Sequence, residues 1–199
     1  MYAFEEDYKQ THLWRVAVSG GQAARITSGD FTVASYRVSA DGRRIAHQRA
    51  PSPLFGEADR GEVWVMDSGG GGAVALTKNA VSESGAELSP DGSAVLFVAA
   101  ANASFEPYYN DKIFLAPATG GPVRVLAPEF PYELERATWS KDGRAIHFTA
   151  NTGVRSQLFT VPAAGGTPEP LTKGDHSFAG WQYSAAADAH VLVRDEVTN

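Results

Sequence analysis

Residues 86–99 read AELSPDGSAVLFVA, and this stretch decides the fold of the chain. Asp91 precedes Gly92, a pair that suits a tight turn because Asp hydrogen-bonds its own backbone and Gly accepts a positive φ without a Cβ clash. Pro90 presets φ one position earlier. The runs on either side of the turn then pair antiparallel, so the stretch predicts a β-hairpin.

The same corner occurs three times along the chain. Ser39–Gly42 and Ser140–Gly143 repeat its Ser-x-Asp-Gly pattern, and Asp91 lies 50 residues after Asp41 and 51 before Asp142. A fixed period of this length indicates a repeat architecture. The structural turn residues that the period predicts are Asp41, Gly42, Asp91, Gly92, Asp142 and Gly143.

A second marker recurs with the same period: an aromatic residue inside a short apolar strand. These residues are Trp14, Trp64, Phe114 and Phe159. Each is followed by a glycine turn, and an aliphatic residue that ends a further short strand comes 12 residues after it every time. Each period therefore predicts a four-stranded antiparallel meander. The last strand is the most polar and proline-rich, as an edge strand is, so the fold class is an all-β propeller.

The repeats divide the chain into three full blades and two half blades. We expect residues 1–199 to form a single propeller segment that is cut inside a repeat at both ends. Its expected parts are a half blade at 12–28, blades at 33–77, 82–127 and 133–172, and a half blade at 178–194.

Charge and composition narrow the partners of the chain. Seventeen basic against 23 acidic residues, with no basic run, leave little to attract phosphate backbones or anionic lipid, so we expect neither nucleic-acid nor membrane partners. The chain has no cysteine, which fits a cytoplasmic and a periplasmic protein equally. We expect no metal and no cofactor, because His47, His147 and His190 fall one per repeat and cannot converge on an ion.

The repeat motif resembles that of known propellers. Trp-Ser-x-Asp-Gly stands at 139–143, and the Leu-Thr pair that ends the repeat stands at 76–77 and 171–172. This pattern resembles the propeller of TolB-type proteins and of prolyl oligopeptidase-family serine peptidases, with the acylaminoacyl and dipeptidyl peptidases favoured by long aromatic loop inserts. The resemblance to the peptidases implies an α/β-hydrolase domain as partner and peptides as substrates.

Catalysis by this chain alone is not expected. No serine stands in the Gly-x-Ser-x-Gly setting of a hydrolase nucleophile elbow, so we name no catalytic residue. The glycine run at 69–72 is interpreted as a hairpin turn and not as a phosphate cradle, because a strand and no helix follows it. Glu5 and Glu6 invite comparison with the paired glutamates of dipeptidyl peptidases, although the surrounding residues do not match that motif.

The strongest binding candidates come from topology. In a meander, the loops between second and third strands and between successive blades share one rim, and these loops hold most of the loop aromatics. Exposed aromatics are costly in water, so a cluster of them marks a contact surface for a domain or a ligand. The alternative is that each ring folds back over its own blade. The residues concerned are Phe105, Glu106, Tyr108, Tyr109, Phe130, Tyr132 and Glu133.

The sequence leaves two functions open. The first is a non-catalytic propeller that gates and positions peptide substrates for a hydrolase domain absent from this chain. The second is a TolB-like propeller that serves as a protein–protein interaction module.

The half blades predict one further partner. A lone hairpin is marginal in water and leaves an unpaired edge. The two halves either close within one chain or pair between two chains, and we expect the second, a homodimer through the half blades.

Overall fold

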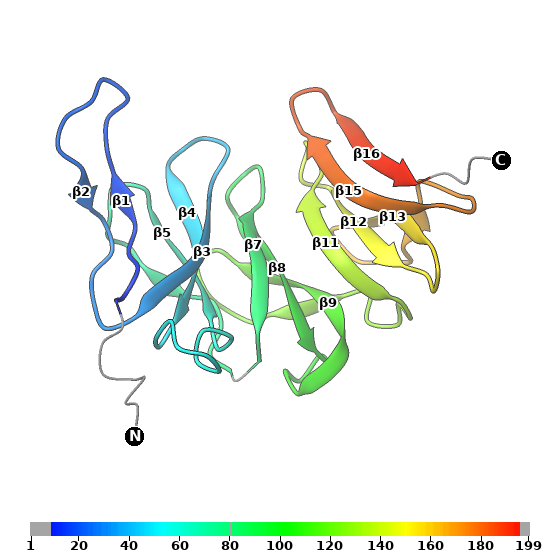
Figure 1. Cartoon of the computed structure of the whole chain (residues 1–199), viewed down its shortest axis with the longest axis horizontal. Helices are drawn as coiled ribbons and strands as arrows, with labels where there is room; N and C mark the ends of the chain where they lie inside the picture. Colours follow the sequence, from blue (N-terminus) through cyan, green and yellow to red (C-terminus); the bar gives the residue numbers. More distant parts are fainter. Residues whose placement is uncertain (1–8, 80, 196–199) are drawn as a thin grey trace.

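The computed structural model describes residues 9–79 and 81–195, which form strands and the turns and loops between them. The strands make three four-stranded sheets and two two-stranded sheets. Figure 1 shows the sheets side by side in chain order along an arc, with the two-stranded sheets at its ends. In the described part of the chain, no helix is long and apolar enough to cross a membrane.

Strand bounds follow the repeats. The first full sheet contains β3 (Thr32–Val38), β4 (Arg44–Ala50), β5 (Glu62–Asp67) and β6 (Val74–Ala75). The second contains β7 (Glu83–Leu88), β8 (Ala94–Ala101), β9 (Pro107–Pro117) and β10 (Arg124–Leu126). The third contains β11 (Glu133–Trp139), β12 (Ala145–Asn151), β13 (Ser156–Pro162) and β14 (Glu169–Pro170). The end sheets pair β1 (Trp14–Arg15) with β2 (Ala24–Arg25) and β15 (Ser177–Ser184) with β16 (Ala189–Asp195).

Each full sheet is an antiparallel meander, as the sequence predicts. Every strand pairs with its neighbour in the chain, and the fourth strand is an edge of only two or three residues. The first strands of successive sheets lie next to one another, since β7 contacts both β3 and β11. We call β3, β7, β11 and β15 the inner strands.

Apolar side chains on the second and third strands join the sheets. The second strand β8 is apolar on both faces, because Val95 and Phe97 pack in a cluster with the first sheet and Leu96 and Val98 in a cluster with the third. Phe97 and Phe114 lie opposite each other between the first and second sheets, with ring centroids 5.4 Å apart, and Phe148 and Phe159 repeat this pair in the third sheet. In the second and third sheets, the aromatic marker of the sequence is thus a packing position.

One rim of the molecule carries the short turns, 39–43, 67–72, 89–93, 117–122, 140–144 and 162–167; we call it the turn rim. In the turn 89–93, Asp91 Oδ1 accepts hydrogen bonds from Ser89 Oγ at 2.6 Å and from the backbone N–H of Ser93 at 3.0 Å. Ser89 Oγ in turn accepts from the N–H of Ala94 at 3.0 Å. Gly92 has φ +73°, a left-handed conformation that glycine adopts at no steric cost.

The other two corners repeat this network bond for bond. Ser39 and Asp41 hold Gly42 at φ +72°, and Ser140 and Asp142 hold Gly143 at φ +71°. The corner between β15 and β16 differs, because there Asp188 itself adopts φ +51° and accepts from the hydroxyl of Tyr183.

Candidate functional site

Polar side chains recur at one position of the inner strands, two residues before the turn serine. These residues are Arg37, Glu87, Thr138 and Gln182. Arg37 forms an ion pair with Glu87, and the hydroxyl of Thr138 donates to the same carboxylate, at 3.0 and 2.9 Å from its two oxygens. Three successive inner strands are therefore linked through one carboxylate.

Glu87 is the centre of this link. Burial raises the pKa of its carboxyl group, an effect that the guanidinium of Arg37 and the hydrogen bond from Thr138 oppose. Trp139 Nε1 also donates to the backbone oxygen of Glu87, at 3.1 Å. The carboxylate is thus held in a defined position at the edge of an open space.

That space is a cavity of about 420 Å³ between the inner strands. Arg136 reaches across it from β11 and donates to the backbone oxygen of Trp181 on β15, at 3.3 Å. Besides Trp139, which also borders it, the cavity presents two guanidinium groups, two carboxylates, an amide and a second indole. The side chains that supply them are Arg37, Glu87, Glu135, Arg136, Trp181 and Gln182.

This cavity was not predicted from the sequence. The signal was present, because the four recurring positions stand at a fixed offset from the turn serine. Only the packing of the inner strands against one another shows that these positions meet.

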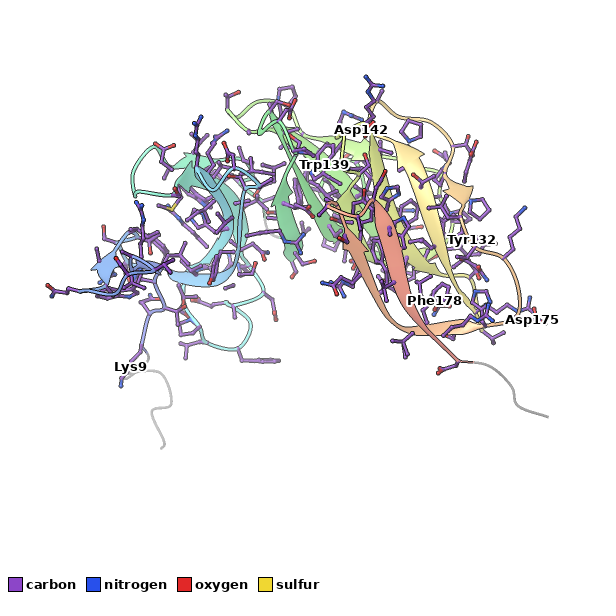
Figure 2. All side chains as sticks on the ribbon, turned by 90° about the horizontal axis from the view of Figure 1, so that it is seen from above. Lys9, Tyr132, Trp139, Asp142, Asp175 and Phe178 are labelled. Atoms are coloured by element: carbon purple, nitrogen blue, oxygen red, sulfur yellow. The ribbon has the colours of Figure 1, made fainter. Side chains whose placement is uncertain are left out.

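The opposite rim carries the longer loops, 51–61, 102–106, 127–132, 152–155 and 171–176, with the strand ends next to them; we call it the loop rim. Figure 2 shows Asp142 of the turn rim and Phe178 and Asp175 of the loop rim at opposite edges of the molecule. The aromatic candidates named from the sequence all lie on the loop rim.

Phe105 and Phe130 of these candidates pack inward. Phe105 adopts φ +56° and stacks on Phe114, with ring centroids 4.8 Å apart. Phe130 lies edge-on to Phe148 and Phe159, at 5.2 and 5.1 Å. Both rings pack against core clusters, Phe105 against that of the first and second sheets and Phe130 against that of the second and third.

The three tyrosines remain accessible. Tyr109 is 81% exposed and lies 4.8 Å from Tyr108, measured between ring centroids. Tyr132 contacts Phe130 edge-on at 5.6 Å and is itself partly exposed, as Figure 2 shows at the side of the third sheet. Lys112 lies with its Nζ 5.8 Å from the Tyr108 ring and donates to the Phe130 backbone oxygen at 2.5 Å. Tyr108, Tyr109 and Tyr132 are thus accessible aromatic residues of the loop rim, and Tyr108 of them contacts Lys112.

The acidic candidates differ from each other. Glu133 accepts a hydrogen bond from the N–H of Asp111 at 3.3 Å, and burial raises the pKa of both carboxyl groups. Glu106 is exposed and accepts from Asn102 Nδ2 at 2.7 Å, which shapes its own loop. Lys112 therefore interacts with both Glu133 and Tyr108, whereas Glu106 lies in the neighbouring loop. Glu5 and Glu6 lie outside the described residues.

Comparison with known proteins gives matches to solved structures alone. No protein-family model matches the chain, and no curated protein does. A protein described as TolB from Agrobacterium tumefaciens superposes with a TM-score of 0.68 and 21% identity, over 95% of this chain and 65% of that one. TolB from Acinetobacter baumannii superposes with a TM-score of 0.57 and 21% identity, over 84% of this chain and 39% of that one. An oligogalacturonate lyase in complex with manganese superposes with a TM-score of 0.70 and 12% identity, over 88% of this chain and 51% of that one.

These likenesses define the class of the protein. The chain has the all-β, propeller-like fold of antiparallel four-stranded sheets. The similarity to the two TolB structures is a similarity of fold, and the chain spans less than two thirds of the length of each of these structures.

Proposed function

We propose that this chain is a non-catalytic propeller segment that binds an extended peptide in the cavity between its inner strands. The observation that supports the proposal is the composition of that cavity. Its volume of about 420 Å³ lies within the range of ligand pockets, roughly 300–1,000 Å³. Its guanidinium and carboxylate groups match acidic and basic side chains of a peptide, and the amide of Gln182 can form hydrogen bonds with the peptide main chain.

Two biological roles are proposed for this peptide binding. Two of the structures similar to this chain are described as TolB, which favours an interaction module that captures a segment of a partner protein. The second candidate is gating of peptide substrates for a hydrolase domain of a prolyl oligopeptidase-family peptidase. The accessible tyrosines of the loop rim favour it, because a second domain would cover them.

Peptide binding is tested with end-capped octapeptides of one length that carry net charges of about −2, 0 and +2. Trp139 and Trp181 border the cavity, so binding is measured by their fluorescence. Arg136→Ala removes a cationic group from the cavity and is expected to weaken binding of the acidic peptide about tenfold, the equivalent of about 1.4 kcal/mol.

The matched control is Arg43→Ala, which removes an exposed arginine from the turn rim and should leave the affinity unchanged. Equal losses in both variants, or no binding of any of the three peptides, would contradict the proposal. The two roles are distinguished by the gene, since a Gly-x-Ser-x-Gly elbow encoded downstream of residue 199 favours the peptidase.

A further inference from the structure

The two end sheets each lack the half that the other possesses. In the full sheets the second strand pairs with the third, as β4 does with β5, β8 with β9 and β12 with β13. β16 is a second strand whose hydrogen-bonded neighbour among the described residues is β15, and β1 is a third strand whose neighbour is β2. Each end sheet therefore presents an open strand edge of the kind to which another strand adds.

The open edges also carry uncovered apolar side chains. Trp14 is 60% exposed, whereas Phe114 at the equivalent position of the second sheet is fully buried. On the other end sheet, Val191 and Val193 are 67% and 60% exposed. In addition, β1 spans two residues, while the third strands of the full sheets span six to eleven. The end sheets thus look like the full sheets with their covering strands removed.

The repeats fix the register in which the two edges would meet. The aromatic marker opposes one position of the second strand in every full sheet: Trp64 opposes His47, Phe114 opposes Phe97, and Phe159 opposes Phe148. The equivalent residue of β16 is Leu192. Ala137 of the inner strand β11 opposes Phe148, and Trp181, which holds the same position in the inner strand β15, opposes Leu192. If β16 and β1 pair antiparallel in the register of the full sheets, Leu192 therefore opposes Trp14 and Val191 opposes Arg15.

The faces agree with this register. Leu13 is buried against the first full sheet, so Trp14, its neighbour along the strand, faces the other way. His190 packs against His147 of the third sheet, with ring centroids 4.7 Å apart, and Leu192 lies on the same face as His190. In a four-stranded sheet made of β15, β16, β1 and β2, Trp14 and Leu192 would both face the third sheet. Each strand would keep the orientation of its two faces.

The two edges of one chain are not beside each other. Figure 1 shows β1 and β16 at opposite ends of the arc. A second copy of the chain supplies the missing half at both places at once, because each copy offers one second-strand edge and one third-strand edge. We propose that β16 of one copy pairs with β1 of another in a two-fold dimer, which buries Trp14, Val191 and Val193.

Light scattering coupled to size exclusion measures the mass of the 199-residue chain at micromolar concentration. We expect a two-chain mass. Val191→Lys combined with Val193→Lys should give a one-chain mass with an unchanged folded spectrum, because both valines are exposed in the single chain. Val154→Lys, at an exposed valine of the loop between β12 and β13, is the matched control and should remain a dimer. A one-chain mass for the parent overturns the proposal.

Cysteine pairs test the register. The chain has no cysteine, so Arg15→Cys in one preparation and Val191→Cys in another can be mixed and oxidised. Residues directly opposite each other lie within disulfide range, and diagonal neighbours lie beyond it, so we expect a two-chain product from this mixture and much less from Ala17→Cys with Val191→Cys. A third preparation carries Arg15→Cys and Val191→Cys in the same chain, and a cross-link formed only within single chains of this variant would show closure within one chain. A dimer without the cross-link would show a different interface. Either result overturns the proposal.

Discussion

On the turn rim, Asp41, Asp91 and Asp142 are exposed, whereas on the loop rim Glu83 is buried and Glu133 is half-buried. Hydrogen bonds from serine and backbone donors lower the pKa of the turn aspartates, to about 2 for Asp91. Burial raises the pKa of the loop-rim glutamates, to about 7 for Glu83. The pKa values of carboxyl groups on the two rims thus shift in opposite directions, because hydrogen-bond donors stabilise the charged form and desolvation penalises it.

The partners of these groups explain why one rim repeats and the other varies. Asp91 bonds within the segment 89–93, so any repeat that keeps those residues keeps the turn. Glu83 accepts hydrogen bonds from the N–H of Val63 at 3.0 Å and from the hydroxyl of Thr77 at 2.5 Å, both from the preceding repeat. Turn-rim order is local, whereas loop-rim order depends on contacts between repeats.

The loop rim does keep one repeated bond. The hydroxyls of Thr27, Thr77 and Thr172 accept the N–H of the residue that precedes each aromatic marker, at 2.8 to 2.9 Å. This is the physical role of the threonine in the Leu-Thr pair. The second sheet has Ala127 at this position, with φ +50°, and Phe130 packs beside it.

The largest expected effect is at Phe130, where the loop rim departs most from the repeat. Phe130→Ala removes a ring from between Phe148 and Phe159 and should lower the free energy of unfolding by about 3 kcal/mol. Urea denaturation measures it. Tyr109→Ala, on the same rim but exposed, should change stability by less than about 0.5 kcal/mol. Similar losses in the two variants would mean that Phe130 does not close the core.

The raised pKa of Glu83 predicts that the free energy of unfolding changes with pH by about 3 kcal/mol. An accessible glutamate has a pKa of 4.5, and burial raises the pKa of Glu83 to about 7 in the folded chain. Between these values the folded state holds a proton that the unfolded state has released, so the free energy of unfolding falls as the pH rises and levels off above about 7.

Glu83→Gln should flatten this part of the profile, measured by urea denaturation at a series of pH values. Glu106→Gln, at an exposed glutamate of the loop rim, should keep the slope of the parent. An unchanged slope in Glu83→Gln would show that Glu83 is ionised when folded.

The smallest expected effect separates two equivalent turns. An added Cβ at Gly92 meets nothing within 4 Å, whereas at Gly143 it would lie 3.2 Å from Pro90 Cδ. Asn tolerates the left-handed conformation of both positions, so Gly143→Asn should cost about 1 kcal/mol more than Gly92→Asn. Pro90→Ala should remove the difference, and melting temperatures measure it. Equal melting of the two variants would contradict the contact.

The sequence predicted the strands well because their signals are local. The Ser-x-Asp-Gly corner and the aromatic strand 12 residues before a final aliphatic residue each specify one hairpin, and in the second sheet these hairpins form as β7 with β8 and as β9 with β10. The loop-rim candidates could not be divided in advance. Phe105 and Tyr109 are four residues apart in one segment, and only the position of Phe114 explains why the first turns inward.

The sequence by itself determined the repeat, the meander and the turn network of Asp91, because each depends on residues within a few positions of one another. Only the tertiary structure decided that Arg37, Glu87 and Thr138 meet, since they are 50 and 51 residues apart and belong to different sheets. It alone decided that Trp14 is exposed while Phe114 is buried. The physical reason is that a side chain is covered by whichever sheet packs beside it, and a repeat specifies its own strands but not its neighbour.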